Sequence, residues 1–217
     1  AAGTNVQTCA LPISAAGTNV QTYTFNQSTA QKWTLLETEK TLYSIMGKTN
    51  VSVSQMVKFY KNKATVSYPY SNVSEAPTIE KFCQIYKEES EVEGVKAEVA
   101  FAQAMMETGF LKFGGDVKKD QYNFAGIGAI GGGSSGAKFD SIRIGIRAHV
   151  QHLKAYASKE ALKQPVVDPR FQYVKRGSAE YVQWLGQKEN PNGYGWATAK
   201  NYGNNIVKLY ILPMKKY

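Results

Sequence analysis

Apolar residues recur every three to four positions through most of the chain after residue 77, which is the spacing of the buried face of a helix. The clearest case begins at Thr78, a residue type that caps helices, and ends at Gly94. Between them stand Ile79, Phe82 and Tyr86 on one face. Similar patterns predict helices at residues 78–94, 95–109, 141–157, 178–185 and 196–210.

The rest of the chain gives little indication of an extended sheet. Residues 113–139 are rich in glycine and predict loops with at most one hairpin. Residues 41–77 hold a short amphipathic piece and then a stretch rich in Ser, Tyr, Pro and Asn, which is typical of a linker. Thr and aromatic residues alternate over residues 23–35, which favours short strands. We therefore expect a mainly α fold with a small loop or hairpin region and a short β-type N-terminal segment.

The N-terminal region contains an identical duplication, because residues 1–8 return unchanged as residues 15–22. Repeats of a natural fold diverge, so we interpret residues 1–14 as a duplication or scar. Gln-Lys-Trp at residues 31–33 resembles the end of a ricin-type β-trefoil lectin repeat. A single repeat cannot close a trefoil, so the resemblance implies only a remnant of a carbohydrate-binding module. The chain then divides into a lectin-like fragment at 1–40, a linker and N-terminal extension at 41–77, and a main domain at 78–217.

The chain is basic, with 26 Lys and Arg against 17 Asp and Glu and a formal net charge of +9. Such a surface attracts polyanions, of which nucleic acid and the anionic polymers of a cell wall are the main classes. The basic residues are dispersed along the chain, whereas nucleic-acid binders concentrate them, so we expect anionic cell-wall polymers as partners and no nucleic acid.

No apolar stretch approaches the roughly 18 residues of a membrane span, and no signal-peptide pattern opens the chain.

Metal ligation is not indicated by the residues that could provide it. Cys9 and Cys83 lack the spacing of a metal site or a disulfide framework, and Cys83 stands on an apolar helical face. His149 and His152 are three residues apart without a matching set of ligands. We expect neither a metal nor a cofactor.

Glu107 is the strongest candidate for chemistry. It lies in the last turn of the predicted helix at residues 95–109, where the helix dipole disfavours a negative charge. Met106, Phe110 and their apolar neighbours would desolvate it, which favours the protonated form. A carboxyl group held neutral in an apolar setting can protonate the leaving oxygen of a glycoside. An exposed glutamate at a helix end is the alternative interpretation of the same position.

Two motifs together resemble the glucosaminidases of glycoside hydrolase family 73. The first is Ala-Phe-Ala-Gln-Ala-Met-Met-Glu-Thr-Gly-Phe at residues 100–110, and the second is Tyr-Asn-Phe-Ala-Gly-Ile at residues 122–127. Residues 196–206 also resemble the closing motif of that family, with Trp196 where Tyr is more usual. The resemblance spans about residues 78–210. It implies a helical, lysozyme-like α+β fold, endo-acting cleavage after N-acetylglucosamine in bacterial peptidoglycan, and a catalytic glutamate at Glu107.

The resemblance also implies substrate contacts on both sides of Glu107. Sugars bind by aromatic stacking and by hydrogen bonds to amides, so the candidate contacts are Tyr122, Asn123, Phe124, Trp196 and Tyr202. Phe124 could equally anchor its loop in the core, and Trp196 and Tyr202 could be packing residues.

A second catalytic carboxylate, which many glycosidases use, has no clear place in the sequence. Residues 125–139, where many family members carry it, contain no acid. The nearest candidates are Asp116, Asp120, Asp140 and Glu189, with Asp140 also a candidate helix cap. The N-acetyl group of the sugar offers another solution, because its amide oxygen can attack the anomeric carbon while Glu107 protonates the leaving group.

Two other functions remain open at this stage. A muramidase or lytic transglycosylase would share the fold and the single glutamate but cut a different bond or use a different acceptor. A non-catalytic cell-wall-binding module would explain the charge and the aromatic residues. The resemblance implies a secreted or cell-wall-associated protein that acts on peptidoglycan glycan strands, and we expect a monomer.

Overall fold

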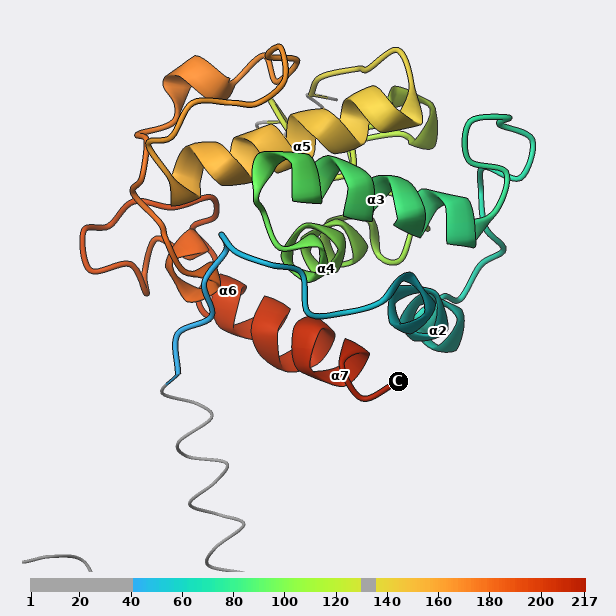
Figure 1. The fold of residues 1–217 in the computed structure, drawn as a ribbon, viewed down its shortest axis with the longest axis horizontal. Helices are drawn as coiled ribbons and strands as arrows, with labels where there is room; N and C mark the ends of the chain where they lie inside the picture. The colour runs from blue at the N-terminus through green and yellow to red at the C-terminus, as the bar shows by residue number, and fades with distance from the viewer. Residues whose placement is uncertain (1–40, 130–135) are drawn as a thin grey trace, which may run out of the picture. The chain divides into compact units, whose positions relative to one another are not determined.

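The computed structural model describes residues 41–129 and 136–217 of the chain (Figure 1). The chain divides into two compact units, Ala1–Thr41 and Leu42–Tyr217, and the second unit holds nearly all described residues. The N-terminal duplication, the Gln-Lys-Trp motif and the strands expected at residues 23–35 lie outside the described residues. In the part of the chain that is described, no helix is both long and apolar enough to cross a membrane.

The prediction of a mainly α fold is confirmed. The described residues form the α-helices α2 (Val53–Lys63), α3 (Ile79–Glu93), α4 (Ala97–Thr108), α5 (Ile142–Ala157), α6 (Tyr202–Asn205) and α7 (Leu212–Met214). They also form the 3₁₀ turns η1 (Lys119–Gln121), η2 (Phe171–Tyr173) and η3 (Val182–Leu185) and a π-helical segment, η4 (Ile206–Ile211). Extended pairing within residues 41–129 and 136–217 is limited to isolated bridges.

Local sequence chemistry explains where the longer helices begin and end. Ser52 starts α2 through a capping box with Gln55, and the Thr78 hydroxyl accepts a hydrogen bond from the Lys81 backbone N–H to start α3. Gly94 ends α3 with φ of 74°, a conformation that glycine adopts without penalty. The cap of α5 is Ser141, so Asp140, the other candidate in the sequence, does not fill that role.

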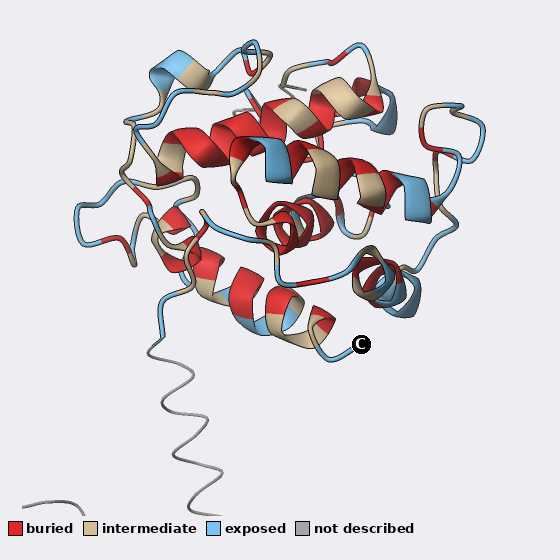
Figure 2. Ribbon diagram, in the orientation of Figure 1, coloured by how far each residue is buried: buried red, intermediate tan, exposed pale blue. Residues whose placement is uncertain are grey.

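Helix α4 is the centre of the molecule. It packs against α2, α3, α5 and η4, and in Figure 1 it is seen end-on between the α3–α5 pair and the C-terminal helices. Most of its residues are buried, so it appears red in Figure 2. A helix that is apolar on all sides needs neighbours on all sides, and here four elements supply them.

Residues 41–77 belong to this same core, which differs from the surface linker that their composition indicates. Ile45, Met56 and Phe59 are fully buried in the main apolar cluster. Met46 forms a bridge with Val95, next to the start of α4. The apolar face of α2 is short, but it packs on α3 and α7, and this tertiary contact is not visible in the local composition.

Two of the five predicted helices are wrong in extent. Residues 178–185 form a bridge at Tyr181 and then only the 3₁₀ turn η3. The C-terminal helix begins at Tyr202 instead of residue 196 and continues to Met214. The physical reason is pairing between the two segments, since the backbone N–H groups of Trp196 and Ala197 both donate to the Leu185 carbonyl, at 2.7 and 3.0 Å.

Candidate active site

Glu107 lies where α4 leaves the core. The preceding turns of the helix are buried, but Glu107 itself is exposed, and the next residue, Thr108, is buried again. The Thr108 hydroxyl donates to the Ala104 carbonyl at 2.7 Å and accepts from the Leu111 N–H at 3.0 Å. This turn holds Phe110 and Leu111 at φ of 57° and 62°, a left-handed conformation that costs energy for residues with a side chain. Strained backbone of this kind is concentrated at functional sites.

The environment of Glu107 favours its protonated form. Burial of the carboxyl group among protein atoms raises its pKa, and a hydrogen bond from the Tyr202 hydroxyl offsets only part of that effect. The residue is nevertheless open to solvent on one side. A carboxyl group that is surrounded by protein and still reachable from solvent can hold a proton and deliver it to a ligand.

A chain of hydrogen bonds runs from Glu107 into the core. Tyr202 Oη, which donates to Glu107, accepts from Gln103 Nε2 at 2.8 Å. Gln103 Oε1 lies 3.0 Å from His149 Nε2, and His149 Nδ1 lies 3.1 Å from the Tyr86 hydroxyl. Gln103, His149 and Tyr86 are all buried.

The chemistry of these groups gives the chain one direction. An amide oxygen only accepts, so the proton of neutral His149 sits on Nε2, and Nδ1 accepts from Tyr86. Burial lowers the pKa of His149 to about 3, which keeps the ring neutral near pH 7. With Gln103 Nε2 donating to it, the Tyr202 oxygen is left to donate its own proton to Glu107. The core thereby orients the hydrogen bond that Tyr202 donates to Glu107.

The loop that carries the Tyr-Asn-Phe motif is held from within. The Asn123 side chain donates to the Ile127 and Ala137 carbonyls at 2.9 and 3.1 Å and accepts from the Ile127 N–H at 2.9 Å. Phe124 is fully buried against Phe82, with ring centroids 5.1 Å apart. Both residues therefore stabilise the loop, and their burial gives no support to the prediction that they contact sugar.

Tyr122 is half-buried at the edge of the same loop and packs on Tyr70. Its carbonyl comes so close to α5 that a Cβ atom at Gly145 would lie 1.9 Å from the oxygen. Only glycine fits at that position, so the sequence itself fixes the approach of the loop to α5. Tyr122 keeps partial access to solvent.

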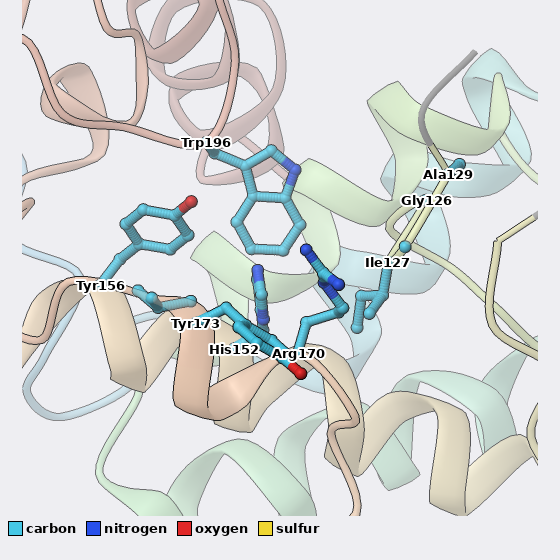
Figure 3. Close-up of a pocket in the computed structure, with 10 residues that line it drawn as sticks. Gly126, Ile127, Ala129, His152, Tyr156, Arg170, Tyr173 and Trp196 are labelled. Carbon is cyan, nitrogen blue, oxygen red and sulfur yellow. The ribbon is translucent and has the colours of Figure 1, made fainter.

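A cavity of about 240 Å³ lies beside this loop (Figure 3). It is lined by Gly126, Ile127, Gly128, Ala129, His152, Tyr156, Arg170, Tyr173, Val174 and Trp196. Glu107 does not line it, but the two are linked, because Trp196 packs edge-on against His149 of the hydrogen-bond chain with centroids 5.8 Å apart. The structure thus brings Tyr202 directly to Glu107, whereas Trp196 is connected to Glu107 through His149, Gln103 and Tyr202.

Gln103, His152, Asp168 and Arg170 were not among the sequence candidates for the site. Gln103 lies one helical turn before Glu107 on a helix with apolar neighbours, a position where a buried amide needs a partner, and that signal was available. Asp168 and Arg170 lie in a loop that carries no sequence pattern. Among the residues that the structure describes, no group of three or more His, Cys, Asp or Glu side chains could hold a metal ion.

The four candidates for a second carboxylate have other surroundings. Asp120 is exposed and 3.8 Å from Lys138, and Asp140 is exposed beside the Ser141 cap. Glu189 accepts from the Asn201 N–H at 2.8 Å, while its Oε2 is buried without a hydrogen-bond partner. Asp116 is half-buried. Within residues 41–129 and 136–217, no carboxylate is among the groups that shift the pKa of Glu107.

Comparison with known proteins identifies one family and one relative. Residues 83–211 match the family model described as mannosyl-glycoprotein endo-beta-N-acetylglucosaminidase, which covers more than half of the chain and includes Glu107, Tyr122 and Tyr202. The match does not reach the Gln-Lys-Trp motif, so the lectin-like interpretation gains no support. An uncharacterized protein of Borreliella burgdorferi is 46% identical over 132 residues, which are 61% of this chain and 61% of that protein. No solved structure matches.

The family match and the fold agree with one another. The matched residues contain α4, α5 and the loop between them, which together carry Glu107 and the Tyr-Asn-Phe motif. The relative has no assigned function, so it extends the similarity without adding to the chemistry. The chain belongs to the glucosaminidase family of glycoside hydrolases.

Proposed function

We propose that this protein is an endo-β-N-acetylglucosaminidase that hydrolyses the glycan strand of bacterial peptidoglycan, with Glu107 as the general acid. The observation that carries the proposal is the environment of Glu107. Its carboxyl group has a raised pKa, one hydroxyl partner whose direction is set from the core, and an open side toward solvent. At Glu89, by contrast, the effect of burial is outweighed by hydrogen bonds from Arg147 and Arg143, and the pKa is lowered.

The reaction begins with the proton of Glu107. Its carboxyl group donates the proton to the glycosidic oxygen, and the bond between that oxygen and the anomeric carbon breaks. The Tyr202 hydroxyl then stabilises the carboxylate that remains, because it donates a hydrogen bond to Oε1 of Glu107. In the second half of the reaction this carboxylate takes a proton from water as the water attacks the anomeric carbon.

The nucleophile of the first half is the N-acetyl oxygen of the substrate. It attacks the anomeric carbon as the leaving group departs, and water later opens the resulting ring, so the product retains its configuration. Residues 125–139 contain no acid, which supports this route. The amide variants of Asp116, Asp120, Asp140 and Glu189 should each lose little activity, and de-N-acetylated glycan should be nearly inert.

We also propose a secreted or cell-wall-associated location. The net charge of +9 and its dispersed distribution suit a surface that meets anionic wall polymers.

Mass spectrometry of the fragments released from purified peptidoglycan tests the activity. N-acetylglucosamine at the new reducing ends is the expected result. N-acetylmuramic acid there would identify a muramidase, and its anhydro form a lytic transglycosylase, and either would overturn the proposal. A protein that binds the wall and releases nothing would be a binding module. Proton NMR of the fresh reducing end tests the route separately, since inversion would require a carboxylate base and an activated water.

A further inference from the structure

The cavity beside the Tyr-Asn-Phe loop has no role in the proton chemistry of Glu107. Its volume of about 240 Å³ lies below the roughly 300–1,000 Å³ of pockets for drug-sized ligands. The space suits one sugar ring or a similarly small group. Its walls come from four places in the chain, namely the loop at Gly126, the last turns of α5, the segment from Arg170 to Val174, and Trp196 (Figure 3).

One wall of the cavity is aromatic. The rings of Tyr156 and Trp196 lie 5.7 Å apart at 36°, and His152 meets Trp196 edge-on at 4.6 Å. The Tyr156 hydroxyl donates to the Gly195 carbonyl at 3.3 Å, which ties α5 to the backbone next to Trp196. Aromatic faces of this kind pack against the C–H face of a pyranose.

The cavity also presents a cation. Arg170 is exposed, and its guanidinium lies 4.5 Å above the Tyr173 ring and points into the space between Trp196 and Ile127 in Figure 3. Among the residues that the structure describes, no carboxylate forms a salt bridge with it. Arginine presents paired N–H donors that match a carboxylate, so this side chain is available for one on a ligand.

An acid two residues before Arg170 in the chain is already used by the protein. The Asp168 side chain is fully buried, and its Oδ2 accepts from His152 Nδ1 at 2.7 Å. Its Oδ1 accepts from the Arg170 backbone N–H at 2.8 Å. Asp168 thereby fixes the His152 ring and anchors the backbone that carries Arg170, while its charge faces away from solvent. Because Asp168 is bound to His152 and to the backbone, it does not neutralise the Arg170 guanidinium by a direct ion pair.

We propose that this cavity is a subsite for a sugar residue that carries a free carboxylate, with Arg170 as the residue that recognises the carboxylate and Trp196 and Tyr156 as the wall for the ring. The inference rests on the proposed function and specifies the substrate, since it requires a muramyl residue whose lactyl group is not linked to peptide. That carboxylate appears when the amide bond to the peptide is hydrolysed, so an amidase reaction would supply this substrate.

The test uses the Glu107→Gln protein, so that binding is measured without turnover. The ligands are the disaccharide of N-acetylglucosamine and N-acetylmuramic acid as its free acid, and the same disaccharide as its primary amide. The free acid should bind about tenfold more tightly than the amide in calorimetry, as expected for one charge-assisted pair. Adding Arg170→Gln should abolish that difference. Lys175→Gln is the matched control, because it removes one exposed positive charge from the same segment without lining the cavity, and the difference should persist.

Three results would overturn the inference. The first is equal affinity for the free acid and the amide. The second is a preference for the acid that survives Arg170→Gln in a folded variant. The third is displacement of the bound acid by poly(glycerol phosphate) at a concentration lower than that of the acid, which would make the cavity a phosphate site.

The proposed function fails by a different measurement. If the wild-type protein released no reducing ends from peptidoglycan while the acid preference and its loss in Arg170→Gln held, the activity would be wrong and the subsite would stand.

Discussion

Carboxylates in two regions of this protein show how the same side chain is used for structure and for chemistry. Between α3 and α5, Glu89 accepts hydrogen bonds from Arg143 at 2.7 Å and Arg147 at 2.9 Å. Burial alone would raise the pKa of Glu89, but these bonds outweigh it and the pKa is lowered. At the end of α4, burial raises the pKa of Glu107 and the single bond from Tyr202 does not compensate.

The difference between the two regions is the number of donors. Glu93, also between α3 and α5, accepts a hydrogen bond from Lys154 Nζ at 2.9 Å. It also accepts from the backbone N–H groups of Lys163 and Gln164 at 2.9 and 3.0 Å. An ionised carboxylate with this many partners is stable in the interior and unreactive. Among the residues that the structure describes, Glu107 has Tyr202 as its hydrogen-bond partner and an open side, so its proton remains available. The comparison predicts that variants in the first region alter stability and variants in the second alter activity.

The largest effect is expected for Glu107→Gln. Loss of the general acid should lower the rate of glycan cleavage by about 10²–10⁴-fold. A group whose pKa is raised in the folded state contributes stability that is present below its unfolded pKa and is lost as the pH rises through the folded value. The melting temperature of the variant at pH 7 should therefore equal or exceed that of wild type. The increase in melting temperature should be smaller at pH 4, where the wild-type carboxyl group is itself protonated. Differential scanning calorimetry at both pH values, beside a reducing-end assay, measures both effects.

Glu91→Gln is the matched control, because Glu91 is an exposed residue of α3 paired only with Lys87. Its activity should equal that of wild type. Cleavage by Glu107→Gln at more than a tenth of the normal rate would remove Glu107 from the mechanism.

The next effect concerns stability in the first region. Lys154→Met should cost about 3–5 kcal/mol in the free energy of unfolding, because it leaves Glu93 buried without its cation. Urea denaturation measures this loss, and the double variant with Glu93→Gln should recover part of it. Lys87→Met, which breaks an exposed pair, should cost at most about 1 kcal/mol. Activity per folded molecule should not change, and a selective loss of turnover in Lys154→Met would mean that the two regions are coupled.

These two regions were not equally visible in the sequence. The helical stripes that place α3, α4 and α5 are local patterns, and the same pattern with Gly109 puts Glu107 in the last turn of α4. Its catalytic role was implied by the resemblance of residues 100–110 and 122–127 to a known family. Tyr202 was also a candidate, but its bond to Glu107 joins residues 95 positions apart. No local pattern carries that information.

The errors in the predicted helices have the same origin. Residues 196–201 have helical composition, yet Trp196 and Ala197 pair with the backbone at residues 185–187, and Trp196 packs on α5. The amphipathic piece in residues 53–63 looked like part of a linker because its partners, α3 and α7, lie far away in the chain. The sugar contact of Asn123, which the family resemblance implies, stays a prediction, and the structure adds that its amide donates to carbonyls of its own loop.

A moderate effect is expected for Tyr202→Phe. The hydroxyl lowers the pKa of Glu107, so its removal should raise that pKa further and move the basic limb of the pH–activity profile to higher pH. The rate at the optimum should fall about tenfold, because the carboxylate formed after proton transfer loses its donor. Tyr210→Phe is the control. Burial and the nearby Glu107 raise the pKa of Tyr210, but its hydroxyl does not form the bond, so the basic limb should stay in place. An unmoved limb in Tyr202→Phe would contradict the assigned hydrogen bond.

The smallest effect is expected at the far end of the hydrogen-bond chain, with Tyr86→Phe. The Nδ1 atom of His149 then loses its donor, which should cost about 1 kcal/mol of stability. The Gln103 oxygen still requires a proton on Nε2, so the His149 ring should keep that tautomer and stay neutral from pH 5 to 8, since its pKa is lowered to about 3. Tyr202 would still donate to Glu107, and the basic limb of the pH–activity profile should shift less than in Tyr202→Phe.

Nitrogen-15 NMR of the His149 ring reports the tautomer directly. A proton found on Nδ1 in the wild-type protein would reverse the direction assigned to the chain, and Gln103 could then no longer orient the Tyr202 hydroxyl.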